Sequence, residues 1–558
     1  MGRSIAGASS APKALEFWTL AGLLLTQCLV SARAAEGPKD APPPARAAPT
    51  KEFPVLEYRI DGNTLLPTVE IERAVMSHLG EKKAISDIEA ARGDLEKAYR
   101  DRGYKTVVVN IPEQQVVDGI IRLHVTEAPV GKLHIEGSKY HSLAMIRDEL
   151  VQLNEGTVPD FLEVQKELAQ VNRTQDLAIT PVLKASETPG RVDVDLRVND
   201  KLPLHATVEV DNHYIANTTH LRTSGEIEYD NLFQRNHTLS FQYQIAPERP
   251  GDAEIWSASY VAPTRGDLIW ALYAVHSNSN IGAVGDLSVI GKGNIYGLRL
   301  ITPLPTPSRD FYHSFTGGVD YKDFKQSVIL GGASGSIESP ASYPLFTLQY
   351  SGTWLGGGSR SHYIPATTGG RSSFSIDASI SFDIRGLGTN QLQFADKRAG
   401  ASPSFFVFRP GLQREQLLPG AWSLIARVDG QLAGGPLINN EEFSAGGADS
   451  VRGYVESERL ADEGIRGSLE LRTPQLLSRS FRRIERSYIL VFVDAAHLKV
   501  LDPLPNQVET YDLESAGLGL RFKAAGFAIN LDGARIFKEG YVTEAGRYRG
   551  LFQVSYTY

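Results

Sequence analysis

The chain has 558 residues, of which 42% are hydrophobic and 22% charged, and a net charge of −8 from 57 basic and 65 acidic residues. This length predicts more than one domain, and the composition excludes a wholly disordered chain. The acidic balance argues against a broad nucleic-acid-binding surface, so we expect no nucleic-acid partner. The single cysteine, Cys28, excludes disulfide frameworks and cysteine-based zinc sites. A mean hydropathy of −0.20 does not exclude a membrane protein, because membrane strands that alternate apolar and polar residues average near zero.

The N-terminus has the pattern of an export signal. Lys13 precedes an apolar run over residues 17–30, and residues 32–34 (Ala-Arg-Ala) have the spacing that a signal peptidase reads. We therefore expect a signal peptide over residues 1–34; the alternative is a membrane anchor. Residues 35–52 are rich in Pro and Ala, which disfavours a helix and predicts a linker. No later segment has the roughly 18 consecutive apolar residues of a transmembrane helix.

Two similar modules follow, over residues 53–128 and 129–200. Residues 56–63 (LEYRIDGN) resemble residues 131–138 (GKLHIEGS), and both segments predict a short strand that ends in a glycine turn. Each module then continues as two helices and two strands, and the Ser-x-x-Glu sequence at residues 86–89 predicts a capping box. A β-α-α-β-β unit leaves one sheet edge free to accept an extended peptide by strand addition. The alternative is a spacer domain whose edge is merely shielded.

From residue 201 to 558 the pattern changes to strict alternation of apolar and polar residues, as in residues 239–245 and 374–382. Period two places alternate side chains on opposite faces of a sheet. Sixteen such segments begin between Leu204 and Arg549, about 22 residues apart on average, which predicts a transmembrane antiparallel β-barrel. A soluble stack of β-sandwiches would alternate similarly, but the predicted signal peptide and the aromatic final strand FQVSYTY favour the barrel. Side chains alone cannot fill a bore of this size.

One connection in the barrel, over residues 433–464, is far longer than a β-hairpin needs. Glycines allow its backbone to turn tightly and pack close to a wall, and an arginine offers a planar fork of donors that suits a carboxylate. We expect this loop to fold into the lumen. Its candidate pore-loop residues are Gly446, Gly447, Val451, Arg452, Gly453 and Tyr454.

Alternation also suggests a partner for the loop arginine. If the odd-numbered apolar residues of residues 488–494 face lipid, then Phe492 and Asp494 face the lumen. A carboxylate is tolerable there because the lumen is wet, whereas it would be costly against lipid. We therefore predict that Arg452 pairs with Asp494 and so positions the loop. The alternative is a static lumenal brace.

These residues resemble the Val-Arg-Gly-Tyr loop motif and the Phe-x-Asp strand motif of two-partner secretion transporters, the outer-membrane partners of haemolysins and filamentous haemagglutinins. The paired N-terminal modules look like polypeptide-transport-associated (POTRA) domains. The resemblance implies a Gram-negative outer-membrane protein whose periplasmic POTRA domains capture an unfolded exoprotein and whose barrel passes it outward. Two departures stand out: Ala496 occupies a position that is often glycine in the strand motif, and the Pro-rich linker replaces the N-terminal plug helix of some members.

We expect no enzyme, no cofactor and no metal site, because the 12 histidines show no metal spacing and no catalytic triad or phosphate loop can be placed. Two other functions stay open. The first is an insertase that assembles other outer-membrane barrels with the same modules, and the second is a passive porin. The resemblance implies a secreted exoprotein, outer-membrane lipids and the barrel-assembly machinery as partners, and we expect a monomer.

Overall fold

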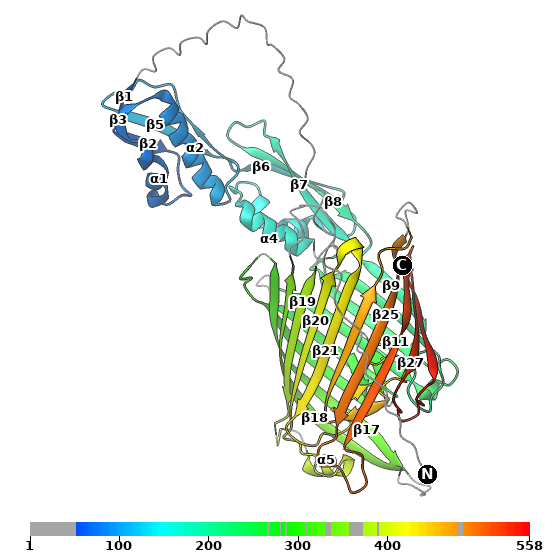
Figure 1. The fold of residues 1–558 in the computed structure, drawn as a ribbon. Helices are drawn as coiled ribbons and strands as arrows, with labels where there is room; N and C mark the ends of the chain where they lie inside the picture. Colours follow the sequence, from blue (N-terminus) through cyan, green and yellow to red (C-terminus); the bar gives the residue numbers. More distant parts are fainter. Residues whose placement is uncertain are drawn as a thin grey trace, which may run out of the picture.

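The computed structural model contains two small α+β domains followed by a closed β-barrel (Figure 1). It describes residues 52–172, 174–264, 268–279, 281–284, 287–308, 310–329, 336–356, 372–384, 386–387, 390–477 and 484–558. The predicted signal peptide and nearly all of the predicted linker, where a plug helix would lie, fall outside these residues. Within the described residues, no helix is both long enough and apolar enough to cross a bilayer.

The first domain packs two helices against a three-stranded sheet of order β2-β5-β4, in which β2 is parallel and β4 antiparallel to the central β5. Its elements are β1 (Phe53–Val55), β2 (Glu57–Asp61), α1 (Thr68–Val75), β3 (Gly80–Lys83), α2 (Ile85–Asp101), β4 (Val107–Asn110) and β5 (Ile120–Glu127). Ile88, Leu95 and Tyr99 form the buried face of α2. The predicted capping box at residues 86–89 is wrong: the N-cap of α2 is Ala84, two residues before Ser86, and the Asp87 carboxylate accepts from the Ala84 N–H at 2.8 Å.

The second domain repeats this arrangement with the sheet order β6-β8-β7. Its elements are β6 (Val130–Glu136), α3 (Leu143–Glu149), α4 (Phe161–Val171), β7 (Leu177–Ala185) and β8 (Val192–Asp200). The glycine turns of the two domains match: Gly62 has φ +89° and Gly137 has φ +93°. A Cβ at either glycine would collide with a carbonyl oxygen of the neighbouring strand, which explains why glycine stands at both positions. Each sheet has two outer strands, β2 and β4 or β6 and β7, whose far edges are unpaired within the sheet.

The barrel has 16 antiparallel strands, and β28 closes it against β9 through the register Gln553↔Asp211 to Thr557↔Thr207. Closure leaves no open strand edge, as a hydrocarbon environment requires. The strands are β9 (Leu204–Asp211), β10 (Arg222–Leu232), β11 (His237–Ile245), β12 (Glu254–Pro263), β13 (Ile269–Ser277), β16 (Gly293–Pro303), β17 (Phe311–Ile329), β18 (Ser336–Leu355), β19 (Ser373–Phe382), β20 (Phe406–Leu417), β21 (Ser423–Ala433), β24 (Glu463–Arg472), β25 (Ile484–Lys499), β26 (Thr510–Ala524), β27 (Phe527–Ile536) and β28 (Tyr548–Thr557). The predicted sixteen-strand barrel is confirmed, although β18 starts well before its expected start near Tyr343 because its pairing with β17 continues through Pro340.

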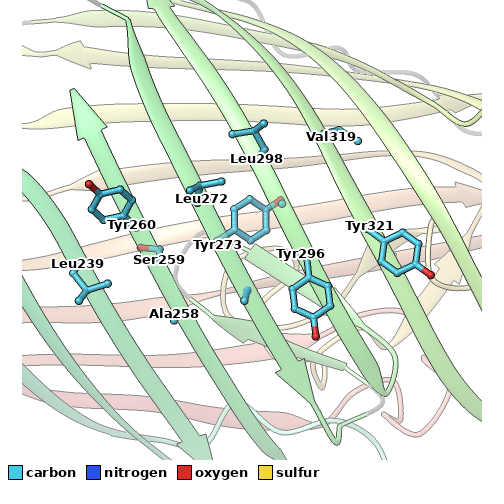
Figure 2. Close-up of a pocket in the computed structure, with 12 residues that line it drawn as sticks. Leu239, Ala258, Ser259, Tyr260, Leu272, Tyr273, Tyr296, Leu298, Val319 and Tyr321 are labelled. Carbon is cyan, nitrogen blue, oxygen red and sulfur yellow. The ribbon is translucent and has the colours of Figure 1, made fainter. Parts of the chain in front are cut away.

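The outer wall of the barrel is apolar and aromatic. A depression of about 530 Å³ on this wall spans β11 to β17, and Figure 2 shows its lining side chains along neighbouring strands. Leu239, Leu272, Tyr296 and Tyr321 of this lining are all exposed. Such a surface suits contact with lipid tails, whereas polar side chains turn to the lumen, as in the 2.7 Å hydroxyl contact between Ser240 and Ser259.

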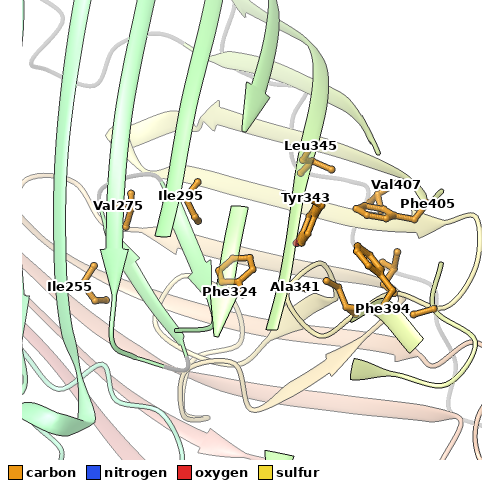
Figure 3. Packing of buried hydrophobic residues seen from close by; sticks show 13 residues of the cluster. Ile255, Val275, Ile295, Phe324, Ala341, Tyr343, Leu345, Phe394, Phe405 and Val407 are labelled. Atoms are coloured by element: carbon orange, nitrogen blue, oxygen red, sulfur yellow. The ribbon is translucent and has the colours of Figure 1, made fainter. Parts of the chain in front are cut away.

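A buried apolar cluster occupies part of the barrel at the end remote from the α+β domains, where the short helix α5 (Gln391–Lys397) also lies (Figure 1). Figure 3 shows Phe394 of α5 beside Tyr343 and Phe405, and their ring centroids lie 5.2 to 6.1 Å apart. Leu437 and Ile438, from the long loop after β21, belong to the same cluster. Loop residues therefore pack against the inner wall, and the bore is not lined by strand residues alone.

Candidate functional site

The long loop runs from the end of β21 to the start of β24, over residues 434–462. Inside it, β22 (Phe443–Ala445) pairs with β23 (Arg459–Ala461), so that the tip over residues 446–458 projects from a short two-stranded stem. The tip packs on the inner wall, because Val451 and Tyr454 are fully buried in one cluster with residues of β25, β26 and β27. The loop thus folds inward, and its apolar side chains replace water along this part of the wall.

Arg452 makes the central polar contacts of the tip. Its Nε and Nη2 atoms each donate to the Asp494 carboxylate at 2.7 Å, and its backbone N–H donates to the same carboxylate at 3.1 Å. Its Nη1 donates to Glu470 at 2.6 Å and its Nη2 to the Ser468 hydroxyl at 3.0 Å. The guanidinium also lies over the Phe492 ring, 3.6 Å from the centroid. Each nitrogen of the fork therefore donates to a side chain of β24 or β25.

The predicted alternation along β25 holds in the structure. Leu490, Phe492 and Asp494 are buried inside, and Asp494 has no exposed surface, whereas the apolar residues between them are exposed on the outer wall. The structure thus brings together Arg452, Phe492 and Asp494 from segments about forty residues apart. A buried ion pair of this kind adds little net stability but fixes geometry, because a shifted loop would leave its charges unpaired.

Sequence reasoning missed Glu470 and Ser468, the other two partners of the arginine. In the β24–β25 ladder Ser468 lies opposite Asp494, and Glu470 lies opposite Phe492. Directly opposed residues of an antiparallel pair share a face, so knowledge of this register would have identified both. Register depends on pairing between strands, and alternation within one strand does not reveal it.

Two loop glycines allow the close approach of the tip to its surroundings. Gly453 has φ +98°, and a Cβ there would lie 2.9 Å from the Ala534 Cβ on β27. Gly446 has φ +111°, and its Cβ would lie 2.6 Å from the Glu458 Cβ. Both positions therefore need glycine for conformation and for space. Gly447 also has positive φ, at +110°.

A second anchor connects the tip to the β27–β28 loop, and the sequence did not reveal it. The Glu458 carboxylate accepts from the backbone N–H groups of residues 541–543 at 2.5, 2.7 and 3.0 Å, and from the Thr543 hydroxyl at 2.7 Å. The Tyr454 hydroxyl lies 2.8 Å from the Lys538 carbonyl oxygen and accepts from the Glu514 N–H at 3.2 Å. The tip is therefore held on two sides, by strand side chains and by a neighbouring loop.

A third anchor joins the long loop to α5. Asp462 has no exposed surface and accepts from both Nη atoms of Arg398 at 2.5 and 2.7 Å. The same carboxylate accepts from the backbone N–H groups of Leu437 and Leu501, each at 2.7 Å. Four donors on one buried carboxylate tie three loops of this end into one assembly.

The second α+β domain is joined to the barrel at the opposite end. The Asp200 carboxylate accepts from the N–H groups of Lys139, Tyr140 and His141 at 2.6 to 2.9 Å and contacts the His141 ring nitrogen at 2.7 Å. Burial alone would raise the pKa of Asp200, but these hydrogen bonds to the ionised form hold the pKa below its usual range. The Tyr140 carbonyl in turn accepts from Gln234 in the β10–β11 turn at 3.0 Å.

The fold and the inward loop define a class: an outer-membrane β-barrel that carries periplasmic POTRA modules. Comparison with known proteins agrees. The ShlB-type POTRA domain model matches residues 53–128, and the model of the haemolysin secretion/activation protein ShlB/FhaC/HecB matches residues 367–522, which include the inward loop and β25. The chain is therefore similar to transporters of the two-partner secretion type, and it is an outer-membrane barrel protein with its POTRA domains in the periplasm.

Curated relatives and solved structures cover most of the chain. The heme/hemopexin transporter protein HuxB of Haemophilus influenzae is 22% identical over 87% of this chain and 84% of its own length. The outer membrane transporter CdiB of Escherichia coli is 24% identical over 76% of this chain and 70% of its own length. The structure of CdiB from Escherichia coli matches with a TM-score of 0.65 at 15% identity, covering 93% of each chain, and that of CdiB from Acinetobacter baumannii with 0.59, covering 94% of this chain and 95% of the other. At such identity the structural matches show the fold.

Proposed function

We propose that the chain translocates a secreted partner protein in an extended state, with the POTRA domains capturing the cargo and the barrel conducting it to the cell surface. The observation that carries the proposal is the Arg452 fork, which holds a loop tip inside the barrel on buried carboxylates. The unpaired outer strands of the POTRA sheets offer edges to which an extended peptide could add. Two relatives are named a heme/hemopexin transporter protein and an outer membrane transporter, and both names support a transport function.

In this proposal the inward loop is an obstruction that the cargo displaces. The tip is held by the polar contacts of Arg452 with the wall, by those of Glu458 with the β27–β28 loop, and by apolar packing of Val451 and Tyr454. Displacement breaks these contacts and leaves the hydrogen-bonded barrel strands intact. Folding of the cargo outside the cell would then hinder its return. We propose no catalytic step, cofactor or nucleic-acid partner for this process. Outer-membrane lipids would surround the apolar wall of a monomer that the barrel-assembly machinery inserts.

The stem of the loop offers a sharp test. Ala445 and Arg459 are opposed in the β22–β23 pair, so residues 446–458 can be replaced by an Asn-Gly turn without stretching the stem. We expect this variant to raise conductance in planar bilayers, because the tip no longer occupies the lumen. Arg249→Ala, which truncates an exposed arginine paired with Asp252, is the matched control and should leave conductance unchanged. Equal conductance of the tip deletion and the wild type would count against an obstructing loop.

Two further measurements separate this proposal from the other functions that the sequence left open. Depletion of the protein should remove a specific secreted protein from the medium or cell surface, whereas an insertase would cause broad loss of outer-membrane barrels. Deletion of residues 53–200 should abolish secretion while the barrel still conducts ions. A passive porin would retain its full function in that deletion.

A further inference from the structure

Three metal-ligand side chains from two domains meet at the periplasmic mouth of the barrel. Asp176 precedes β7 of the second POTRA domain, His205 lies in β9 and Asp230 in β10. The His205 Nε2 atom is 2.7 Å from the Asp176 Oδ2 and 3.5 Å from the Asp230 Oδ2. One ligand atom from each of the three residues lies within 4.8 Å of the others, and no other such group of three occurs in the described part of the chain.

The barrel register places two of these ligands on one face. His205 lies directly opposite Glu228 in the β9–β10 pair, and Asp230 is two residues from Glu228 on the same side of the strand. Ile227, the residue before Glu228, is exposed on the outer wall. Because alternate side chains of a strand point to opposite faces, Glu228 and Asp230 turn to the lumen, together with His205 opposite Glu228. Asp176 approaches them from the POTRA domain, with only 4% of its side chain exposed.

The charge balance of this cluster favours a cation. With a neutral imidazole the three side chains carry two negative charges, and Glu228 adds a third. Among the described residues, His205 is the only basic side chain within ion-pair distance of Asp176 or Asp230. The Thr238 hydroxyl donates to the Asp230 Oδ1 at 2.7 Å, which orients the carboxylate and leaves its Oδ2 toward the histidine. Such support of a ligand from behind is common at metal sites.

We propose that Asp176, His205 and Asp230 bind one divalent transition-metal ion of the Zn²⁺ class, which clips the second POTRA domain to the mouth of the barrel. Tetrahedral zinc with bonds of about 2.0–2.2 Å places its ligand atoms about 3.3–3.6 Å apart. The 3.5 Å separation matches this value, and the 2.7 Å separation must lengthen by about 0.6–0.9 Å. A set of one imidazole and two carboxylates suits zinc better than Ca²⁺ or Mg²⁺, which prefer oxygen ligands alone.

The site also has an entry path. The His205 side chain is 31% exposed, so solvent reaches the cluster and a water molecule can supply the fourth ligand. Because Asp176 belongs to one domain and the other two ligands to the barrel, bound metal would restrict the movement of the POTRA domain relative to the barrel. The same three side chains without metal make a hydrogen-bonded His–Asp pair, and the experiment must distinguish these two states.

The test uses the full mature protein in detergent, purified with a tag that contains no histidine. We expect one equivalent of Zn²⁺ to bind in calorimetric titration, Co²⁺ to give the intense visible bands of a tetrahedral site, and zinc to raise the melting temperature. His205→Ala and the near-isosteric Asp230→Asn should each weaken zinc binding by about 100-fold or more, since loss of a supporting group alone costs about 10- to 100-fold. Because Asp230→Asn preserves side-chain size, it keeps the test valid if His205→Ala fails to fold.

His497→Ala is the matched control. His497 pairs with Asp512 at the same 2.7 Å, but both side chains are more than half exposed and no third ligand joins them within the described residues. This variant should bind zinc like the wild type. The proposal is overturned if the wild type binds no Zn²⁺ or Co²⁺, or if Asp230→Asn and His205→Ala bind zinc as tightly as the control.

Discussion

Replacement of Arg452 with alanine should release the loop tip from the barrel wall. The guanidinium contacts Asp494 at 2.7 Å through two nitrogens and Glu470 at 2.6 Å, and its own side chain is only 5% exposed. Its removal leaves two largely buried carboxylates without a countercharge. Loss of one partner of a buried pair costs ~3–5 kcal/mol. Because only the docked tip buries these groups, the cost falls on the docked state, and local opening becomes about 10²- to 10⁴-fold more populated.

Amide hydrogen exchange of residues 446–458, followed by mass spectrometry on the protein in lipid nanodiscs, measures this opening directly. Arg452→Lys keeps the positive charge but loses the planar fork, so we expect a smaller increase in exchange, roughly tenfold. Arg249→Ala serves as the control, since this exposed arginine lies outside the loop and its anchors and pairs with Asp252. Exchange in the tip of this control should match the wild type.

A charge-reversal cycle tests the same pair and exposes the role of Glu470. Arg452→Asp should impair docking, and adding Asp494→Arg should rescue it only in part, because Glu470 then lies beside a carboxylate at position 452. Adding Glu470→Gln should improve the rescue. If Arg452→Ala leaves tip exchange unchanged, or if the cycle shows no coupling, then Arg452 does not hold the loop and the reasoning fails.

Three other predictions concern the remaining anchors and the POTRA domains. Glu458→Ala removes the acceptor of three backbone N–H groups, so proteolysis within residues 537–547 should become faster; equal cleavage rates would contradict this second anchor. Gly137→Ala should lower the melting temperature, at a cost of about 1–3 kcal/mol, because φ there is +93° and the added Cβ meets a backbone carbonyl. Gly93→Ala, in open space on a helix, is its control and should be neutral or stabilising. Because folding lowers the pKa of Asp200, the ionised carboxylate stabilises the fold at neutral pH, and this stabilisation is lost as the pH falls through the folded-state pKa. Denaturation measured from pH 7 to about pH 3 should show a falling free energy of unfolding, and Asp200→Asn should make that fall smaller.

The order of domains and the number of strands could be predicted from the sequence because both depend on local patterns. Period-two alternation marks a strand with two different faces, and it predicted the sixteen strands that form the barrel. The repeated glycine turns at Gly62 and Gly137 marked the two POTRA modules in the same way, since each needs a positive φ that a side chain would disfavour. The inward face of β25, with Phe492 and Asp494, followed from the same alternation.

Only the tertiary structure decided which groups meet across the barrel. Glu470 and Ser468 join Arg452 through the register of β24 against β25, Glu458 binds a loop eighty residues away, and Arg398 ties α5 to Asp462. The cluster of Asp176, His205 and Asp230 likewise forms only where a POTRA domain touches the barrel mouth. A residue's own neighbours in the chain restrict which face it occupies, but its partners depend on strand register and loop docking, and these are set by the packing of the whole molecule.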